Sequence, residues 1–242
     1  MYCIDHPQVV WIPEKSQIWC RGTVLQSDAV RSEMEIEYCD STGGKNIVTV
    51  SSTTVHPVDP THMLNLDNIC LMNNMHEAPL LDLLKRRFSN NEIYTLTGNI
   101  LISLNPYQAI PGMYDQALKY LHMHGAATQA QSVDTVVDND NERLAPHVFS
   151  TANRALAYMM TSLYSSTATG NQSVVISGES GAGKTENSKY VMSFLIQANK
   201  EMRRPMIAKR SSLGMKITRF TEGLISVLLE SSVVLEAFGN AK

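Results

Sequence analysis

One glycine-rich stretch carries the most specific chemistry in the chain. Residues 178–185 read Gly-Glu-Ser-Gly-Ala-Gly-Lys-Thr. The first glycine, the last glycine and the closing Lys-Thr pair stand at the offsets of the pattern G-x-x-x-x-G-K-[ST]. Glycines at this spacing let the backbone turn its N–H groups inward as a nest for an anion, where side chains would prevent close approach. The stretch therefore predicts a loop that cradles the phosphates of a nucleotide.

The segments on either side of this loop predict the elements that position it. The apolar run at residues 173–177, Ser-Val-Val-Ile-Ser, is typical of a strand. After the loop, apolar residues recur at spacings of three and four, which predicts a helix with the positive end of its dipole at the loop. These residues are Val191, Phe194, Leu195 and Ala198. We expect Lys184 to reach the β- and γ-phosphates and the Thr185 hydroxyl to hold Mg²⁺.

The composition limits the class of protein. Of the 242 residues, 43% are hydrophobic and 18% are charged, which suffices to bury a core. A net charge of −3 with no obviously basic face argues against nucleic acid as the main partner. The cysteines suit reduced intracellular thiols better than a zinc site or disulfides, because they are far apart and form no C-x-x-C pair. We expect a cytoplasmic protein with no transmembrane segment, since no secretory or long apolar run is present.

The first 60 residues have the texture of strands and turns. Segments rich in Val, Ile, Thr, Trp and Tyr alternate with turn clusters, which suggests a small antiparallel β-barrel. The segments are Val9–Ile12, Gln17–Gln26, Glu33–Tyr38 and Asn46–Val55. Pro57 and Pro60 then break the pattern. We therefore predict two domains, residues 1–60 and 61–242.

The second predicted domain mixes helices and strands. Residues 77–88 predict a helix whose basic end, Lys85-Arg86-Arg87, we interpret as a solvated terminus. Residues 93–104 read as two strand pieces around the turn Thr97-Gly98-Asn99. A further helix is predicted to begin at Pro146, with apolar residues at spacings of three and four.

Two polar stretches are interpreted as surface features. Residues 126–143 are acidic and predict a surface insertion of low order, for which a metal site is a minor alternative. Residues 200–210 hold five positive side chains around Pro205 and are interpreted as a solvated loop between helices.

Several stretches, in order, resemble the motor heads of myosins. The octapeptide 178–185, followed by Glu186-Asn187, is similar to the phosphate loop of that family. Asn105-Pro106-Tyr107, with Tyr114 downstream, is similar to its adenine-side loop. His147-Val148-Phe149 matches the segment before the helix that precedes the phosphate loop, and Leu235–Lys242 looks like the lead-in to the first switch loop. The N-terminal barrel resembles the small Src-homology-like barrel that many myosins carry.

The resemblance implies a fold and a set of ligands. The fold would be an α/β phosphate-loop NTPase core, a partial mixed sheet flanked by helices, preceded by the small β-barrel. The cofactors would be ATP and Mg²⁺, with Thr185 on the metal and Lys184 stabilising phosphate charge. The nucleotide contacts would be Gly178, Glu179, Ser180, Gly181, Ala182, Gly183, Lys184, Thr185, Asn105, Pro106, Tyr107 and Tyr114.

The resemblance also implies partners and a location. The full-length protein would bind actin filaments, carry light chains or calmodulin-like subunits, and lie with the cytoskeleton as part of a myosin complex.

The chain departs from the family's pattern near the adenine-side loop. At Gln108 the family often has Lys, and Gly112 lengthens the turn before Tyr114.

Hydrolysis needs groups that the 242 residues do not display. Myosins hold the γ-phosphate and orient the attacking water with two switch segments, similar to Asn-x-x-Ser-Ser-Arg-Phe-Gly and Asp-x-x-Gly-Phe-Glu, and neither pattern occurs here. We therefore expect an N-terminal portion of a motor ATPase that ends before the first switch loop and is inactive alone.

Two other interpretations stay open at this point. An unrelated phosphate-loop kinase or GTPase explains the octapeptide but neither Asn105-Pro106-Tyr107 nor the C-terminal stretch. A motor-like scaffold that holds nucleotide without turnover is compatible with intact Lys184 and Thr185.

Overall fold

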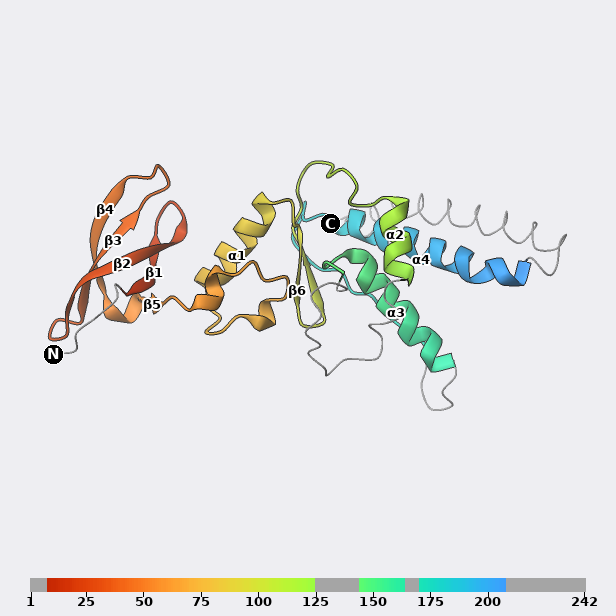
Figure 1. The fold of residues 1–242 in the computed structure, drawn as a ribbon, viewed down its shortest axis with the longest axis horizontal. Helices are drawn as coiled ribbons and strands as arrows, with labels where there is room; N and C mark the ends of the chain where they lie inside the picture. Colours follow the sequence, from red (N-terminus) through yellow and green to blue (C-terminus); the bar gives the residue numbers. More distant parts are fainter. Residues whose placement is uncertain (1–7, 125–143, 164–169, 208–242) are drawn as a thin grey trace, which may run out of the picture. The chain divides into compact units, whose positions relative to one another are not determined.

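The elements of the chain fall into two units. The computed structural model describes residues 8–124, 144–163 and 170–207, and the chain divides into a first unit, Met1–Ile100, and a second unit, Leu101–Lys242 (Figure 1). The domain boundary that the sequence suggests near residue 60 stays a prediction. The acidic stretch 126–143 and the C-terminal stretch Leu235–Lys242 lie outside the described residues.

An antiparallel sheet of five strands begins the first unit. Its strands are β1 (Val9–Glu14), β2 (Ile18–Asp28), β3 (Glu33–Cys39), β4 (Lys45–Ser51) and β5 (His56–Pro57), in the order β4-β3-β2-β1-β5. The register of β2 on β3 shifts between Val24 and Gln26, which marks a bulge. The sheet confirms the predicted strands, except that the segment Asn46–Val55 leaves the strand at Ser51 and continues as a 3₁₀ turn. It is compatible with a small barrel-like region.

Alternation of side chains builds the core of this sheet. In β3, Ile36 is fully buried between the half-buried Met34 and Tyr38, while Glu33 and Glu35 are exposed. Ile36 packs with Val10, Ile12 and Cys20. The period of two therefore places the apolar face of β3 inward.

A short helical segment and a hairpin complete the first unit. They comprise the 3₁₀ turns η1 (Ser52–Thr54), η2 (Pro60–Met63) and η3 (Ile69–Leu71), the helix α1 (Glu77–Ser89), and the strands β6 (Tyr94–Thr97) and β7 (Ile100–Ser103), which extends into the second unit. The helix α1 and the turn around Gly98, with φ of +60°, confirm the predictions for residues 77–88 and 93–104.

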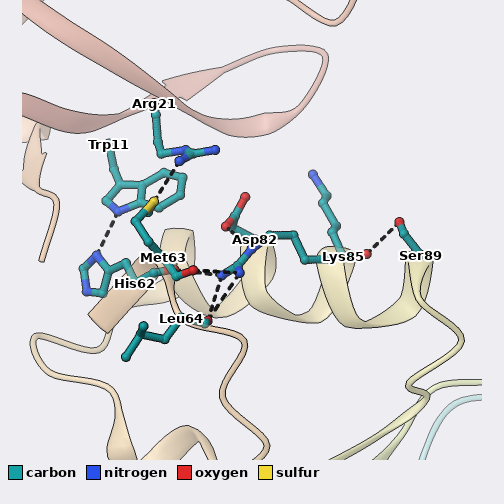
Figure 2. A network of polar contacts seen from close by, with 9 residues as sticks. Trp11, Arg21, His62, Met63, Leu64, Asp82, Lys85 and Ser89 are labelled. Atoms are coloured by element: carbon teal, nitrogen blue, oxygen red, sulfur yellow. Dashed lines mark hydrogen bonds and ion pairs between the residues drawn. The ribbon is translucent and has the colours of Figure 1, made fainter. Parts of the chain in front are cut away.

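A buried histidine ties β1 to the segment that follows the sheet. Trp11 Nε1 donates to His62 Nδ1 at 3.1 Å (Figure 2). The Asp59 backbone N–H donates to the same atom at 3.1 Å. Since Nδ1 accepts both bonds, the proton of the neutral ring is on Nε2, which lies 2.9 Å from the Asn73 carbonyl oxygen. His62 has no exposed surface, so these bonds satisfy both ring nitrogens without water.

The basic end of α1 is bound into the first unit, contrary to the interpretation as a solvated terminus. Arg86 forms an ion pair with Asp82 at 2.9 Å and donates to the carbonyl oxygens of His62 at 2.7 Å and Leu64 at 3.3 Å (Figure 2). Arg87 is only 4% exposed and donates to Thr95 Oγ1 and the Tyr94 carbonyl oxygen, both at 2.9 Å. These guanidinium groups are fixed because several acceptors converge on each of them.

The described part of the second unit contains three helices. They are α2 (Gln116–His124), α3 (Val148–Leu163) and α4 (Lys184–Ile207). Phe149 of α3 stacks on Phe194 of α4 with centroids 5.3 Å apart, and both side chains are fully buried. The helices predicted after Pro146 and after the phosphate loop are confirmed, whereas α2 was not predicted. The helix α4 continues through Pro205 to Ile207, so the start of the basic stretch 200–210 is helical rather than a loop.

The strand expected before the phosphate loop is absent from the described residues. Residues 173–177 have no ladder partner there, and the Val175 side chain is 87% exposed. A strand exists only through hydrogen bonds to a neighbour, so an apolar run alone does not form one. The mixed sheet of the expected NTPase core is accordingly not present in the part of the chain that the structure describes. In this same part, no helix is both long and apolar enough to cross a membrane.

Removing the buried guanidinium of Arg87 is expected to destabilise the first unit. Arg87→Ala leaves the Thr95 hydroxyl and the Tyr94 carbonyl without their charged donor, which costs about 2–4 kcal/mol of unfolding free energy. Urea unfolding followed by tryptophan fluorescence measures this, because Trp11 and Trp19 are the chain's two tryptophans and both lie in the first unit. The control Lys85→Ala removes an exposed charge of the same helix and should cost less than about 1 kcal/mol. Equal losses in the two variants would contradict the role given to Arg87.

Candidate functional site

The backbone of the glycine-rich loop adopts conformations that side chains disfavour. Gly181 and Gly183 have φ of +78° and +89°, in the left-handed region. A Cβ added at Gly178 would lie 3.2 Å from Ala182 Cβ. The loop is therefore wound tightly on itself, as a nest of backbone N–H groups requires.

Lys184 folds back over the start of the loop. Its ammonium donates to the carbonyl oxygens of Gly178 at 2.9 Å and Glu179 at 2.8 Å. The Glu179 carbonyl oxygen also accepts the Ala182 N–H at 3.2 Å. An ammonium carries three donors, so these two bonds leave capacity for an oxygen of an anion. The cation thus closes the loop and lies where a phosphate would need its charge.

Helix α4 begins directly at Lys184. Its first backbone bond runs from the Asn187 N–H to the Gly183 carbonyl oxygen at 3.0 Å, so the N-terminal end of the helix dipole lies at the loop. Thr185 is half-buried in this first turn. Among the described residues, no three His, Cys, Asp or Glu side chains gather as a metal site. A hydroxyl in the first turn fits a Mg²⁺ ion whose remaining ligands are phosphate oxygens and waters.

The loop at residues 105–107 lies against the glycine-rich loop. Asn105 Nδ2 donates to the Gly181 carbonyl oxygen at 2.7 Å, and the Tyr107 hydroxyl lies 3.4 Å from the same oxygen. Tyr107 itself has φ of +51°, and its N–H donates to Asn105 Oδ1 at 2.9 Å. The structure thus brings Asn105 and Tyr107 next to Gly181. A nucleotide contact by Asn105, Pro106 or Tyr107 stays a prediction.

A second contact joins the end of β7 to the start of α4. Asn187 Nδ2 lies 3.1 Å from Ser103 Oγ and 3.1 Å from the Gly183 carbonyl oxygen. Sequence reasoning did not assign a role to either side chain. Both stand within two residues of a predicted site residue, and Asn187 also belongs to the stretch that resembles the family's phosphate loop.

Tyr114 lies in a cluster of rings that packs against α4. Its ring stacks on Tyr190, with centroids 3.5 Å apart and an interplanar angle of 7°, and its centroid is 5.6 Å from that of His147. Burial and the Glu186 charge raise the pKa of Tyr190. Tyr190 was not singled out in the sequence, although it stands four residues before the buried Phe194. An adenine contact by Tyr114 stays a prediction.

Two buried histidines support this cluster. His147 directly precedes α3, and its Nδ1 accepts the Phe149 N–H at 3.1 Å, which caps the helix. Burial lowers the pKa of His147 to about 3, and the neighbouring His122 adds to this shift. Burial likewise lowers the pKa of His122 to about 4; its Nδ1 lies 3.0 Å from Ser150 Oγ. Both imidazoles are therefore neutral in the folded chain at neutral pH.

Comparisons with known proteins point to one family. A family model described as "Myosin head (motor domain)" matches residues 66–242. The chain is 34% identical over 234 residues to "Myosin-7" of Arabidopsis thaliana. This match covers 96% of the chain and 11% of that protein. It is 26% identical over 242 residues to "Myosin-1" of Saccharomyces cerevisiae, which covers 97% of the chain and 12% of that protein. The chain thus spans about an eighth of the length of the curated relatives it matches.

Acid is expected to destabilise the second unit through His122 and His147. Their folded pKa values lie below 6.5, so the unfolded chain binds protons that the folded chain does not; stability is complete above pH 6.5 and falls as the pH drops toward 4. Each histidine should cost about 2 kcal/mol of unfolding free energy between pH 7 and pH 5. Guanidinium unfolding followed by circular dichroism at the helix band measures this.

His147→Asn is the matched variant. An asparagine side chain also accepts a helix N–H but does not titrate, so the pH dependence of stability should fall by about half. The same slope in both proteins would show that His147 does not carry the effect.

Proposed function

The chain belongs to the myosin head (motor domain) family, and we propose from this that it forms the ATP-binding part of an actin-based motor and holds MgATP with residues 178–185. The observation that carries the proposal is the position of Lys184, whose ammonium lies over the glycine-rich loop at the first residue of α4. Membership of this family removes the unrelated kinase and GTPase interpretations.

Each residue of the loop has a distinct task in this proposal. The backbone N–H groups of residues 178–181 and 183 donate to phosphate oxygens, and the helix dipole of α4 adds to their attraction. Lys184 keeps its bonds to the Gly178 and Glu179 carbonyls and directs its remaining ammonium donor at the β- and γ-phosphates. The Thr185 hydroxyl holds Mg²⁺, which supplies charge neutralisation at the phosphates when bound.

The base side of the pocket is proposed at the 105–107 loop. The Tyr107 side chain is 82% exposed beside the phosphate loop, so its ring can stack on a base without disrupting the fold around it. Tyr114 would have to exchange its stack on Tyr190 for a nucleotide before it could take part. The favoured base contact is therefore Tyr107.

Turnover, actin binding and subunit binding are proposed for the full-length motor. In the family, hydrolysis depends on two switch loops, and no stretch of the 242 residues resembles either. Actin filaments, light chains or calmodulin-like subunits, and a location on the cytoskeleton follow only from the family. A nucleotide-holding scaffold without turnover is the second candidate, since Lys184 and Thr185 serve binding in both.

Replacing Lys184 by alanine should abolish measurable ATP binding. The variant loses the charge-assisted bonds to phosphate, which should weaken MgATP binding by more than tenfold in isothermal titration calorimetry. Lys189→Ala is the control, because it removes a charge from the next turn of α4, where Lys189 pairs with Glu186 at 2.7 Å. Unchanged affinity in Lys184→Ala would refute the site.

The polypeptide of residues 1–242 is expected to bind MgATP with little turnover. Phosphate release in the steady state should be slower than about 0.01 s⁻¹, a hundredfold below the lower end of common enzyme rates near 1 s⁻¹. Lys184→Ala serves as the blank for contaminating activity. Turnover near 1 s⁻¹ that disappears in Lys184→Ala would contradict the expectation.

A further inference from the structure

The geometry points to a role for Asn105 that differs from a base contact. We propose that Asn105 is a positioning residue, which fixes the Gly181 carbonyl and thereby presets the phosphate loop before a polyphosphate ligand arrives. The inference rests on the proposed nucleotide-binding function.

Both ends of the Asn105 amide are committed to the protein. Its Nδ2 donates to the Gly181 carbonyl oxygen at 2.7 Å, and its Oδ1 accepts the Tyr107 N–H at 2.9 Å. The side chain is half-buried, and it would lie 3.8 Å from a Cβ placed on Gly183. To contact a base, the amide would have to give up both hydrogen bonds.

The bond to Gly181 orients the peptide that follows it. A peptide unit is planar, so fixing the Gly181 C=O also fixes the Ala182 N–H, which donates to the Glu179 carbonyl oxygen at 3.2 Å and closes the turn of the loop. Gly181 has φ of +78° and carries no side chain that could restrict the loop by itself. Asn105, which lies outside the glycine-rich loop, thus provides the restraint that the loop itself lacks. A loop that is already ordered loses less conformational freedom when it binds an anion.

A parallel contact restrains the far end of the loop. Asn187 connects Ser103 Oγ with the Gly183 carbonyl oxygen, at 3.1 Å from each. Residues 103–107 therefore hold the loop at two of its glycine carbonyls, Gly181 and Gly183. The restraint is a property of the whole segment, and Asn105 makes its shortest bond.

Tyr107 provides the contrast within the same loop. Its backbone is held at φ of +51° by the bond to Asn105, and its ring is 82% exposed. One residue of the motif is thus committed to the phosphate loop and the other presents an open aromatic face. The two residues are expected to act on different parts of a nucleotide.

The test compares a ligand with a base and a ligand without one. Isothermal titration calorimetry measures the Kd of MgATP and of Mg-tripolyphosphate for the 242-residue chain and for Asn105→Ala, Tyr107→Ala and Asn171→Ala. Asn105→Ala should weaken both ligands by about fivefold, the value of one hydrogen bond. Tyr107→Ala should weaken MgATP alone. Asn171→Ala, an exposed asparagine seven residues before Gly178, should change neither Kd.

Further readouts separate positioning from general damage. The binding stoichiometry of Asn105→Ala should stay at the unaltered value, because misfolding would reduce the competent fraction rather than raise Kd. Asn105→Ser keeps an oxygen for the Tyr107 N–H but is too short to reach the Gly181 carbonyl, so it should match Asn105→Ala.

The outcomes distinguish the inference from the function beneath it. Weakening of MgATP alone in Asn105→Ala, or unaltered affinities in Asn105→Ser, overturns the positioning role and leaves the nucleotide site intact. Failure of the unaltered chain to bind either ligand overturns the proposed function and this inference with it.

Discussion

The proposed phosphate loop can bind an anion only if its carbonyl oxygens are turned away from that anion, and side chains of the second unit hold these oxygens in place. Each peptide that offers an N–H to a phosphate also carries an oxygen that would repel it. Here side chains hold those oxygens by hydrogen bonds. Lys184 donates to the carbonyl oxygens of Gly178 and Glu179, Asn105 donates to that of Gly181, and Asn187 donates to that of Gly183. These bonds hold the start of α4, the end of the β6–β7 hairpin and the 105–107 loop around one short stretch of backbone.

Neutral histidines perform a comparable task in both units. His62 accepts from Trp11 and the Asp59 N–H, and His147 accepts from the first turn of α3. Each bond requires a lone pair on Nδ1. For His147, burial lowers the pKa to about 3 and so keeps the ring uncharged at neutral pH. An imidazole in these positions joins a polar contact to an apolar surface, which neither a serine nor a leucine could do.

Local patterns predicted much of the fold, and long-range partners account for what they missed. The strands β1 to β4, the helix α1 and the buried face of Val191, Phe194 and Ala198 follow from periods of two and of three to four. The offsets of the glycines and of Lys184-Thr185 in residues 178–185 are also a local pattern, and they predicted a tight loop ahead of α4. The burial of Arg87 depends on Thr95 and the Tyr94 carbonyl, and the stack of Tyr114 depends on Tyr190. Neither contact could be predicted from the residue spacing around Arg87 or Tyr114 alone. The run at 173–177 failed as a strand because a ladder needs a neighbour that its own sequence cannot supply.

The length of α4 gives the loop a mechanical reach. The helix runs for 24 residues from Lys184, which corresponds to a rod of about 36 Å at 1.5 Å per residue. A tilt of about 5° at the end that bears the lysine would displace the opposite end by about 3 Å, several times the shift at its origin. Pro205 lies near that opposite end and offers no backbone N–H, so the last turns of α4 have one hydrogen bond fewer than an uninterrupted helix. A change of ligand at the glycine-rich loop would therefore be amplified along α4 before it is absorbed.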